Sequence, residues 1–253
     1  MGNNPLTNHS NHKHGAVPFD DIKLEHFIPA LDYAIEEAEK SMEIIKKDSD
    51  EPTFDNTILP MECSTELMDS ITSIYFNLMG AESDNEFKEL AQKISPKLSS
   101  FKNKILLDST LFQRIKILHE NKNDDELSSE QKRLIDEYHT DFMQNGALLN
   151  EGDKEKVRLI DEELSKLSPK YSQNTLNATN DFTYHTDDES ELSGLPKMAK
   201  EQAAETAREK NMETGWMFTL QMPSYIPVMQ FADNRNLRES MYKARGGIAF
   251  GGK

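Results

Sequence analysis

Apolar residues recur at alternating three- and four-residue steps along most of this chain. Over residues 24–45 one such series comprises Ile28, Leu31, Ile35, Ala38, Met42 and Ile45. This spacing places the apolar side chains on one face of an α-helix. Comparable series follow over residues 67–78, 87–94, 98–118 and 134–142. The pattern therefore predicts a mainly α-helical protein, a multi-helix antiparallel assembly in which amphipathic helices bury their apolar faces against one another.

A longer helix is predicted from about residue 153 to residue 176. Its apolar face would carry Val157, Ile160, Leu164, Leu167 and Tyr171. Pro169 lies inside this pattern and is expected to kink the helix, because proline lacks the N–H that an interior helical position donates.

Two short segments depart from the helical pattern. Residues 181–186 and 216–220 are rich in aromatic and β-branched side chains, which favour strands. A helix is predicted between them, over residues 196–210, after the sequence Gly194-Leu195-Pro196. We expect the two segments to pair as one small two-stranded β element.

The domain organisation is predicted from changes in polarity along the chain. Residues 1–17 are polar and read as a flexible N-terminal tail, either natural or introduced by cloning. Three histidines in this tail, His9, His12 and His14, leave metal binding as the alternative interpretation. Residues 18–253 would form one helical domain, with a subdivision near residue 150.

The charge balance argues against nucleic acids as partners. The chain has 45 acidic and 29 basic residues and a formal net charge of −16, and its lysines and arginines are interleaved with carboxylates. Such a surface repels a phosphate backbone. A preference for cationic substrates stays open. No apolar run approaches the length of a membrane span, so no membrane span is expected.

Cys63 is the only cysteine, so an intrachain disulfide is excluded. We expect it to be a small buried thiol rather than a reactive one, since no histidine partner is evident in the sequence. This cysteine usage favours a cytoplasmic location; a periplasmic location stays the alternative if a signal peptide was removed.

A self-contained zinc-peptidase motif is absent from the sequence. An H-E-x-x-H helix places two histidine ligands one turn apart, with a glutamate that acts as general base. The His-Glu pair here is His119-Glu120, and Asn123 occupies the position of the second histidine. Asparagine cannot replace an imidazole ligand. We therefore predict that this chain contains no catalytic residues, no metal ligands and no cofactor.

Several motifs occur in a fixed order along the chain. The N-terminal ones are Pro18-Phe19, Glu25-His26-Phe27-Ile28-Pro29-Ala30, Pro52-Thr53-Phe54-Asp55-Asn56-Thr57-Ile58, Gly146-Ala147-Leu148-Leu149 and Leu164-Ser165-Lys166-Leu167. The C-terminal ones are Leu192-Ser193-Gly194-Leu195-Pro196, Trp216-x-x-Thr219-Leu220, Pro223-Ser224-Tyr225-x-Pro227-Val228-Met229 and Asn234-Arg235-x-Leu237-Arg238-Glu239-x-x-Tyr242-x-Ala244. As an ordered set they resemble the N-terminal region of M3-family zinc oligopeptidases, especially the dipeptidyl carboxypeptidase and oligopeptidase A branch.

The resemblance implies a helical shell in which two halves enclose a deep channel for short unfolded peptides. In that family the H-E-x-x-H helix and the other catalytic residues lie C-terminal to the point where this chain stops. We therefore expect a non-catalytic wall of the channel, inactive alone, with zinc, short peptides and the absent C-terminal catalytic domain belonging to the full-length parent. Endopeptidase and dipeptidyl carboxypeptidase activities of that parent stay alternatives. A stand-alone helical module that binds peptides or proteins is the other hypothesis.

Two C-terminal features are candidates for function. Tyr225 is the candidate for a channel-facing residue. The residues Asn234, Arg235, Leu237, Arg238, Glu239 and Tyr242 are predicted to be structural. In this interpretation the charged members form ion pairs and helix-end hydrogen bonds, while Leu237 and Tyr242 pack inward; contact with substrate is the alternative. A fragment that lacks its catalytic half would expose apolar surface, so self-association is also expected.

Overall fold

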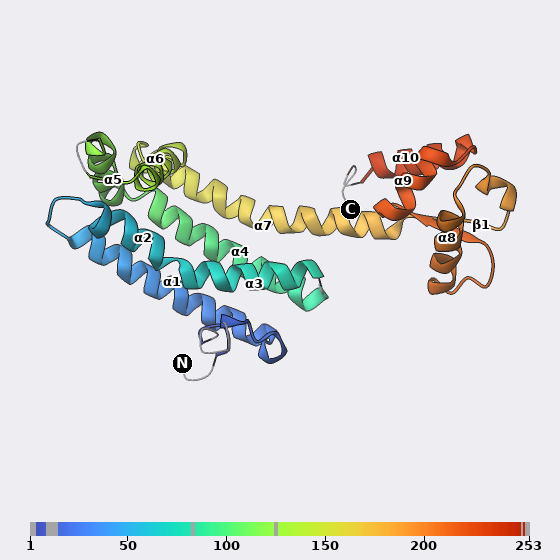
Figure 1. Cartoon of the computed structure of the whole chain (residues 1–253), viewed down its shortest axis with the longest axis horizontal. Coiled ribbons are helices and arrows are strands. Elements are labelled where there is room, and N and C mark those ends of the chain that lie inside the picture. Colours follow the sequence, from blue (N-terminus) through green and yellow to red (C-terminus); the bar gives the residue numbers. More distant parts are fainter. Residues whose placement is uncertain (1–3, 9–14, 82–83, 124–125, 249, 251–253) are drawn as a thin grey trace. The chain divides into compact units, whose positions relative to one another are not determined.

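The computed structural model describes residues 4–8, 15–81, 84–123, 126–248 and 250, and it confirms the mainly α-helical prediction (Figure 1). The helices are α1 (Leu24–Lys47), α2 (Leu59–Ser64), α3 (Glu66–Ala81), α4 (Asn85–Leu106), α5 (Ser109–Asn121), α6 (Ser129–Gln144), α7 (Glu151–Asp181), α8 (Lys197–Glu209), α9 (Met222–Phe231) and α10 (Arg235–Gly246). None of the helices in these described ranges is both long enough and apolar enough to span a membrane.

The predicted two-stranded sheet is also confirmed. Strands β1 (Thr183–Thr186) and β2 (Trp216–Thr219) pair antiparallel, with Thr183 opposite Thr219 and Thr186 opposite Trp216. The chain between them includes α8, so the pairing is not that of a tight hairpin.

The chain divides into two compact units, residues 1–169 and residues 170–253. The division falls inside α7 rather than near residue 150, where the sequence suggested it. α7 is one continuous helix through Pro169.

Two hydrophobic clusters form the interior of the first unit. In the first cluster α1 packs against α3 and α4, which run alongside it (Figure 1). Phe27 and Tyr75 are fully buried there and meet edge to face, with ring centroids 5.2 Å apart. The second cluster joins the C-terminal half of α1 to α2, α5 and α6 around Ile115, Ile135 and Phe142. α1 therefore supplies side chains to both clusters.

The described part of the predicted N-terminal tail contacts this core. Leu6 is fully buried in the first cluster, and the Asn4 side-chain amide donates a 2.8 Å hydrogen bond to the carbonyl oxygen of His26. Residues 4–8 thus differ from the free polar tail that the sequence suggested, because one apolar side chain anchors them on α1. His9, His12 and His14 lie outside the described residues.

The second unit packs its sheet and helices around one cluster. Buried members from separate elements include Phe218 of β2, Val228 of α9, and Leu237 and Met241 of α10. A tight turn at Ser193-Gly194 closes this cluster against the segment that follows α9. The backbone N–H of Asp233 donates to the Ser193 carbonyl oxygen at 2.8 Å, and the Ser193 hydroxyl donates to an Asp233 carboxylate oxygen at 2.8 Å.

Gly194 permits this close approach. Its φ is +85°, and a Cβ atom built there would lie 2.1 Å from the carbonyl oxygen of Phe231. Both observations explain why the motif Leu192-Ser193-Gly194-Leu195-Pro196 contains glycine at this position.

We predict that Gly194→Ala destabilises the second unit by about 2 kcal/mol or more, since it adds a left-handed backbone penalty to a backbone clash. Urea unfolding followed by fluorescence of Trp216, the only tryptophan of the chain, measures this loss. Gly246→Ala is the matched control, because no heavy atom lies within 4 Å of the place its new methyl group would take, and it should leave the midpoint unchanged or slightly raised. Equal midpoints for Gly194→Ala and the unmodified chain would contradict the prediction.

Candidate functional site

The His119-Glu120 pair lies at the C-terminal end of α5, where its partners are ordinary side chains. His119 Nε2 is 3.1 Å from an Asp136 carboxylate oxygen, and its ring stacks on the His139 ring at a centroid distance of 4.0 Å. Glu120 is 3.8 Å from the ammonium of Lys116. Among the residues that the structure describes, no group of three or more His, Cys, Asp or Glu side chains is placed to hold a metal ion.

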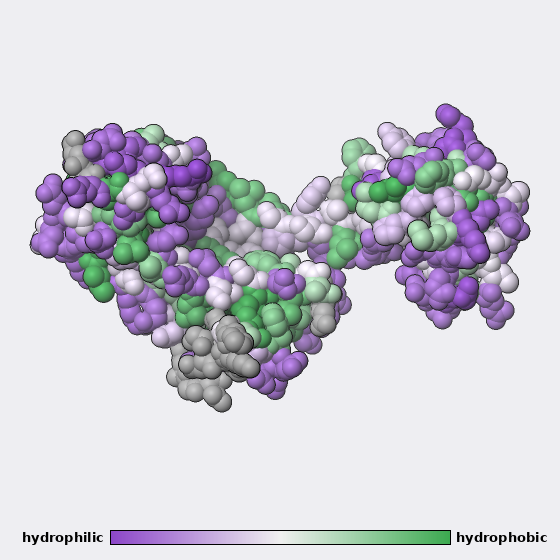
Figure 2. Space-filling model, viewed as in Figure 1, coloured by the Kyte–Doolittle hydropathy of each residue, from purple (hydrophilic) through white to green (hydrophobic). Residues whose placement is uncertain are grey.

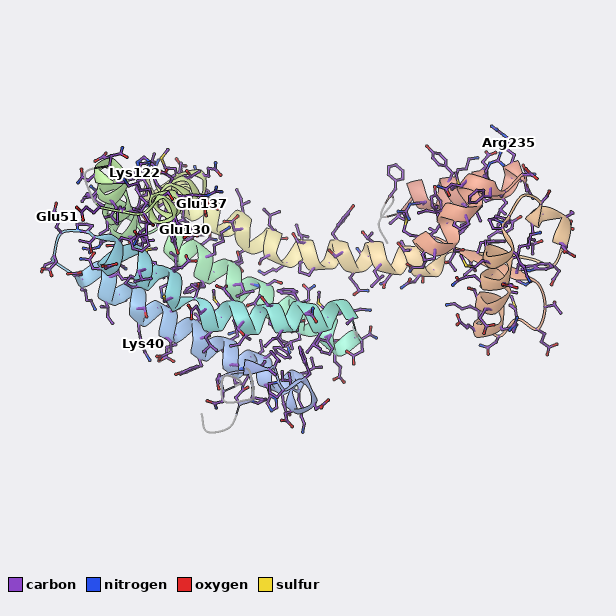
Figure 3. All side chains as sticks on the ribbon, in the orientation of Figure 1. Lys40, Glu51, Lys122, Glu130, Glu137 and Arg235 are labelled. Atoms are coloured by element: carbon purple, nitrogen blue, oxygen red, sulfur yellow. The ribbon has the colours of Figure 1, made fainter. Side chains whose placement is uncertain are left out.

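The stacked histidines form a titratable cluster on the surface of α5 and α6. Lys122, labelled in Figure 3, donates to the same Asp136 carboxylate, and the Phe112 ring stacks on His139 at a centroid distance of 5.7 Å. Burial lowers the pKa of His139, and the neighbouring His119 lowers it further. The Lys122 hydrogen bond lowers the pKa of Asp136, which keeps this carboxylate ionised near neutral pH.

A groove of about 960 Å³ lies between α1, α4, α5 and α7 in the first unit. Ile35, Phe101, Leu107 and Leu159 contribute apolar surface to it. Ion pairs join its walls: Asp32 with Lys97 at 2.7 Å, Glu39 with Lys104 at 2.7 Å, and Asp108 with Lys46 at 2.9 Å.

The groove borders an unusual buried lysine at the start of α7. Lys154 is almost fully buried; its ammonium donates to the Ser109 hydroxyl at 2.6 Å and lies 3.2 Å from a Glu151 carboxylate oxygen. Two partners offset the cost of burying this charge. The arrangement joins α7 to the N-terminal end of α5, and the groove can bind a mixed apolar and charged ligand.

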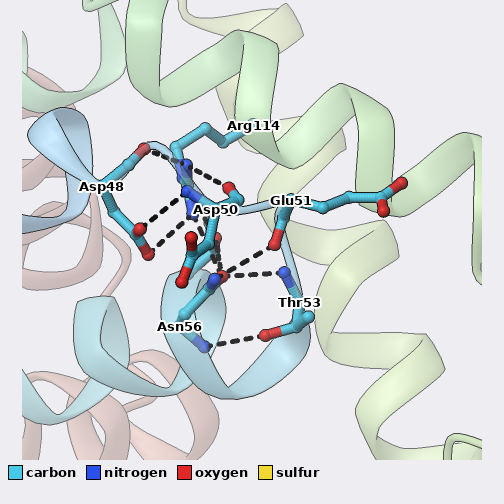
Figure 4. A network of polar contacts seen from close by, with 7 residues as sticks. Asp48, Asp50, Glu51, Thr53, Asn56 and Arg114 are labelled. Atoms are coloured by element: carbon cyan, nitrogen blue, oxygen red, sulfur yellow. Dashed lines mark hydrogen bonds and ion pairs between the residues drawn. The ribbon is translucent and has the colours of Figure 1, made fainter.

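Arg114 of α5 organises the loop that contains the motif at residues 52–58 (Figure 4). Its buried guanidinium donates to the Thr57 hydroxyl at 3.2 Å, the Asp48 carbonyl oxygen at 2.8 Å and the Asn56 side-chain oxygen at 3.1 Å. It also donates to the Asp50 carbonyl oxygen at 3.3 Å and pairs with the Asp48 carboxylate at 3.4 Å. A single side chain thereby satisfies acceptors from both ends of the loop.

Local hydrogen bonds complete this loop. The Asn56 backbone N–H donates to the Thr53 hydroxyl at 3.1 Å, and the Thr53 backbone N–H donates to the Asn56 side-chain oxygen at 2.7 Å. This reciprocal pair is a capping box, which satisfies two backbone donors at a helix start. The motif at residues 52–58 is therefore architectural: it links α1 to α2 and is fixed by α5.

Tyr225, the candidate channel residue, is half-buried on α9. The Arg245 guanidinium lies over its ring at 4.9 Å and also donates to the Leu220 carbonyl oxygen at 3.2 Å. A cation–π contact of this kind holds the ring in place. The structure thus gives Tyr225 a packing role within the second unit; a contact with peptide stays a hypothesis.

The motif at residues 234–242 has largely local contacts. Asn234 caps α10 by accepting from the backbone N–H groups of Asn236 and Leu237 at 2.9 and 3.2 Å, and Leu237 is fully buried. Arg238 donates to the Ala232 carbonyl oxygen, which is the predicted helix-end hydrogen bond.

The other charged residues of this motif are on the surface. Glu239 pairs with Lys243 at 2.6 Å, which lowers the pKa of Glu239, with a smaller contribution from Arg235. Arg235 is exposed and projects from the start of α10 (Figure 3). The prediction that Tyr242 packs inward is wrong, because its side chain is 64% exposed. The inward face of α10 is set by Leu237 and Met241, four residues apart, and Tyr242 lies about 100° around the helix from Met241.

Sequence analysis missed some of these features. It gave no role to Arg114 or Lys154. Arg114 carries charge beside Leu111 and Leu118 on an otherwise apolar helix face, which was the available signal, whereas the polar neighbours of Lys154 offered none. It also placed Cys63 inside, whereas the cysteine is exposed in the short helix α2.

Comparison with known proteins decides the family. The model of the neurolysin/thimet oligopeptidase N-terminal domain matches residues 24–154, which is more than half of the chain. The chain belongs to this M3 peptidase family.

Individual M3 relatives match nearly the whole chain. The dipeptidyl carboxypeptidase of Salmonella typhimurium is 32% identical over 96% of this chain and 36% of its own length. Oligopeptidase A of Haemophilus influenzae is 32% identical over 95% of this chain and 34% of its own, and that of Escherichia coli is 30% identical over 90% and 33%. This M3 chain therefore spans about a third of the length of the relatives that it matches.

We predict that Arg114→Met destabilises the first unit of this M3 chain by about 3 kcal/mol, because it leaves buried acceptors and the Asp48 carboxylate without their partner. Urea unfolding followed by far-UV circular dichroism measures the loss, and hydrogen exchange should show faster exchange in residues 48–57. Arg133→Met is the matched control: Arg133 is largely exposed and pairs with the exposed Glu137 one turn away, so little change is expected. Similar midpoints for the two variants would refute the role given to Arg114.

A second prediction concerns pH. The folded pKa of His139 lies below its unfolded value, so below about pH 6.5 the unfolded chain binds more protons than the folded one and stability falls. We expect the unmodified chain to lose more stability between pH 7.5 and about pH 5.5 than His139→Phe, whose ring can still stack on Phe112. Asp136 titrates below this window and does not contribute to the difference.

Calorimetric midpoints across this pH range measure the difference between the two proteins. His185→Gln, which alters a histidine in the second unit, is the control and should keep the pH dependence of the unmodified chain. Parallel pH profiles for the unmodified chain and His139→Phe would contradict the prediction.

Proposed function

We propose that this chain is the non-catalytic, helical N-terminal part of a zinc metallopeptidase that cleaves short peptides, and that it forms one wall of the peptide channel. The observation that carries the proposal is the match of an M3 N-terminal domain model to residues 24–154. The names of the matched relatives, dipeptidyl carboxypeptidase and oligopeptidase A, support a peptidase that acts on short peptides.

The proposed zinc ion has no fitting site among the described residues. Zinc in a hydrolase requires three protein ligands around an open position, and the side chains described here do not supply such a set. The His119-Glu120 pair is engaged by Asp136 and Lys116 instead. In the proposal, the ligands and the general base come from polypeptide outside these residues, and no step of hydrolysis is assigned to this chain.

The contribution proposed for this chain is binding and exclusion. A rigid wall can orient an extended peptide and exclude folded proteins while another part of the enzyme performs the chemistry. The net charge of −16 would favour peptides that carry lysine or arginine. Tyr225 is the residue proposed to face the peptide, and a cytoplasmic location is proposed with it.

A second candidate function is supported by the groove between α1, α4, α5 and α7. Its volume of about 960 Å³ is large enough for several side chains of a peptide. A stand-alone binding module would use this groove without any cleavage. Titration calorimetry with short basic peptides in the presence of a chelator tests this candidate, and binding that is lost in Phe101→Glu would favour it.

We predict that the purified 253-residue chain binds zinc below stoichiometry and does not cleave fluorogenic peptides, because the residues that the structure describes provide no set of three zinc ligands. Metal analysis after dialysis and a peptidase assay measure both properties. Oligopeptidase A of Escherichia coli, assayed beside it with the same peptides, is the positive control. Stoichiometric, tightly held zinc together with turnover by the 253-residue chain would refute the proposal.

A further inference from the structure

The first half of α7 presents a row of apolar side chains to solvent. Ile160, Leu164 and Leu167 are 58%, 52% and 47% exposed. Their spacing of four and three residues places them on one face of the helix, which we call the apolar α7 face. Figure 2 shows apolar side chains along this part of α7. Single exposed apolar residues are common, whereas a contiguous row of them marks an interaction surface.

The apolar α7 face is exposed because α7 contacts the rest of the first unit through other sides. The Asp161 carbonyl oxygen accepts a 3.3 Å hydrogen bond from the Ser99 hydroxyl, and Lys154 donates to Ser109. Glu155 and Glu162 line the groove. Lys154 is the only residue of α7 that is buried. Leu159 lines the groove as well, so the contact side of the helix is mixed, while Ile160, Leu164 and Leu167 stay exposed on another side. An ordinary surface helix covers such an apolar stripe.

The relatives indicate what covers this face. M3 relatives carry about two thirds of their polypeptide outside the region matched by this chain. We propose that the apolar α7 face is a docking surface for that remaining M3 polypeptide, an inference that rests on the proposed function. A second copy of this chain is a less suitable partner for this face. Three half-exposed side chains supply only part of the roughly 800 Å² per partner that a stable dimer buries.

The carboxylates beside the apolar α7 face indicate which charges the partner surface should carry. Asp161 and Glu163 lie on either side of Leu164 around the helix. Glu163 is near enough to Lys166 to raise the pKa of that ammonium, which pairs directly with Glu162. The partner surface that fits is an apolar patch bordered by lysine or arginine. Such borders favour one docking orientation, since like charges placed opposite these carboxylates would repel.

Cysteine labelling tests the docking surface directly. Cys63, the only cysteine, is exposed and is first replaced by serine. Leu164→Cys then reports on the apolar α7 face, and Lys166→Cys is the matched control: its native side chain is 48% exposed on the same helix, about 160° around from Leu164. Maleimide labelling rates are measured in the 253-residue chain and in the complete product of the gene that encodes it.

We predict that Leu164→Cys and Lys166→Cys react at similar rates in the 253-residue chain. In the complete gene product, Leu164→Cys should react at least about tenfold more slowly, because labelling then requires the docked surfaces to open. Lys166→Cys should keep its rate to within about threefold, since it faces away from the docking surface. This pattern would support docking at the apolar α7 face.

Each other outcome overturns a defined part of the inference. Equal rates in a longer gene product that binds zinc and cleaves peptides would refute docking and leave the proposed function intact. A gene product that ends at Lys253 would refute the proposed function and the docking with it. Slow labelling of Leu164→Cys in the 253-residue chain itself would refute the inference, because the face would then already be covered. If dilution restores the labelling rate, a second copy of the chain covers it; if dilution has no effect, residues 170–253 cover it.

Discussion

The burial of one face of α1 is the interaction on which the first unit depends. Phe27, Leu31 and Ala38 of this face lie in one hydrophobic cluster, and Met42 and Ile45 lie in the other. A helix of 24 residues is about 36 Å long, which is long enough to serve two separate clusters. Helices α2, α3, α4 and α5 all contact this shared element, and Leu6 at the N-terminal end packs in the same cluster as its first half.

Two long basic side chains in this unit donate hydrogen bonds to acceptors from separate segments. Arg114 and Lys154 carry charge into largely buried positions, and each has acceptors from separate segments. Such contacts do not drive folding, because desolvation offsets most of their gain. They instead restrict the conformation of the segments that they join. The loop after α1 is held in the conformation in which its carbonyl oxygens accept hydrogen bonds from the Arg114 guanidinium. The motif at residues 52–58 is thereby explained without any contact to substrate.

Much of the fold could be predicted from local sequence, because periodicity and caps are local properties. Asp84 and Ser128 begin α4 and α6 with side chains that accept hydrogen bonds from backbone N–H groups, the usual role of aspartate and serine at a helix start. The small sheet was visible in the aromatic and β-branched residues at 183–186 and 216–219. Local patterns do not state which element covers a given face. Tyr242, Cys63 and Leu6 were misplaced for this reason, and the groove could not be foreseen, since it is formed by helices far apart in the sequence.

Helix α7 shows most clearly that a local sequence pattern does not determine which face of a helix is covered. Its sequence predicts an apolar face through Ile160, Leu164 and Leu167, and the structure contains that face, but leaves it exposed. A helix of 31 residues with one buried side chain receives little stabilisation from packing. Ion pairs one turn apart, such as Glu155 with Arg158 and Glu162 with Lys166, are too solvent-exposed to replace that packing. The sequence favours a helix throughout α7, but the apolar face of that helix is not covered. An apolar face of this kind is expected where a further polypeptide packs against the helix.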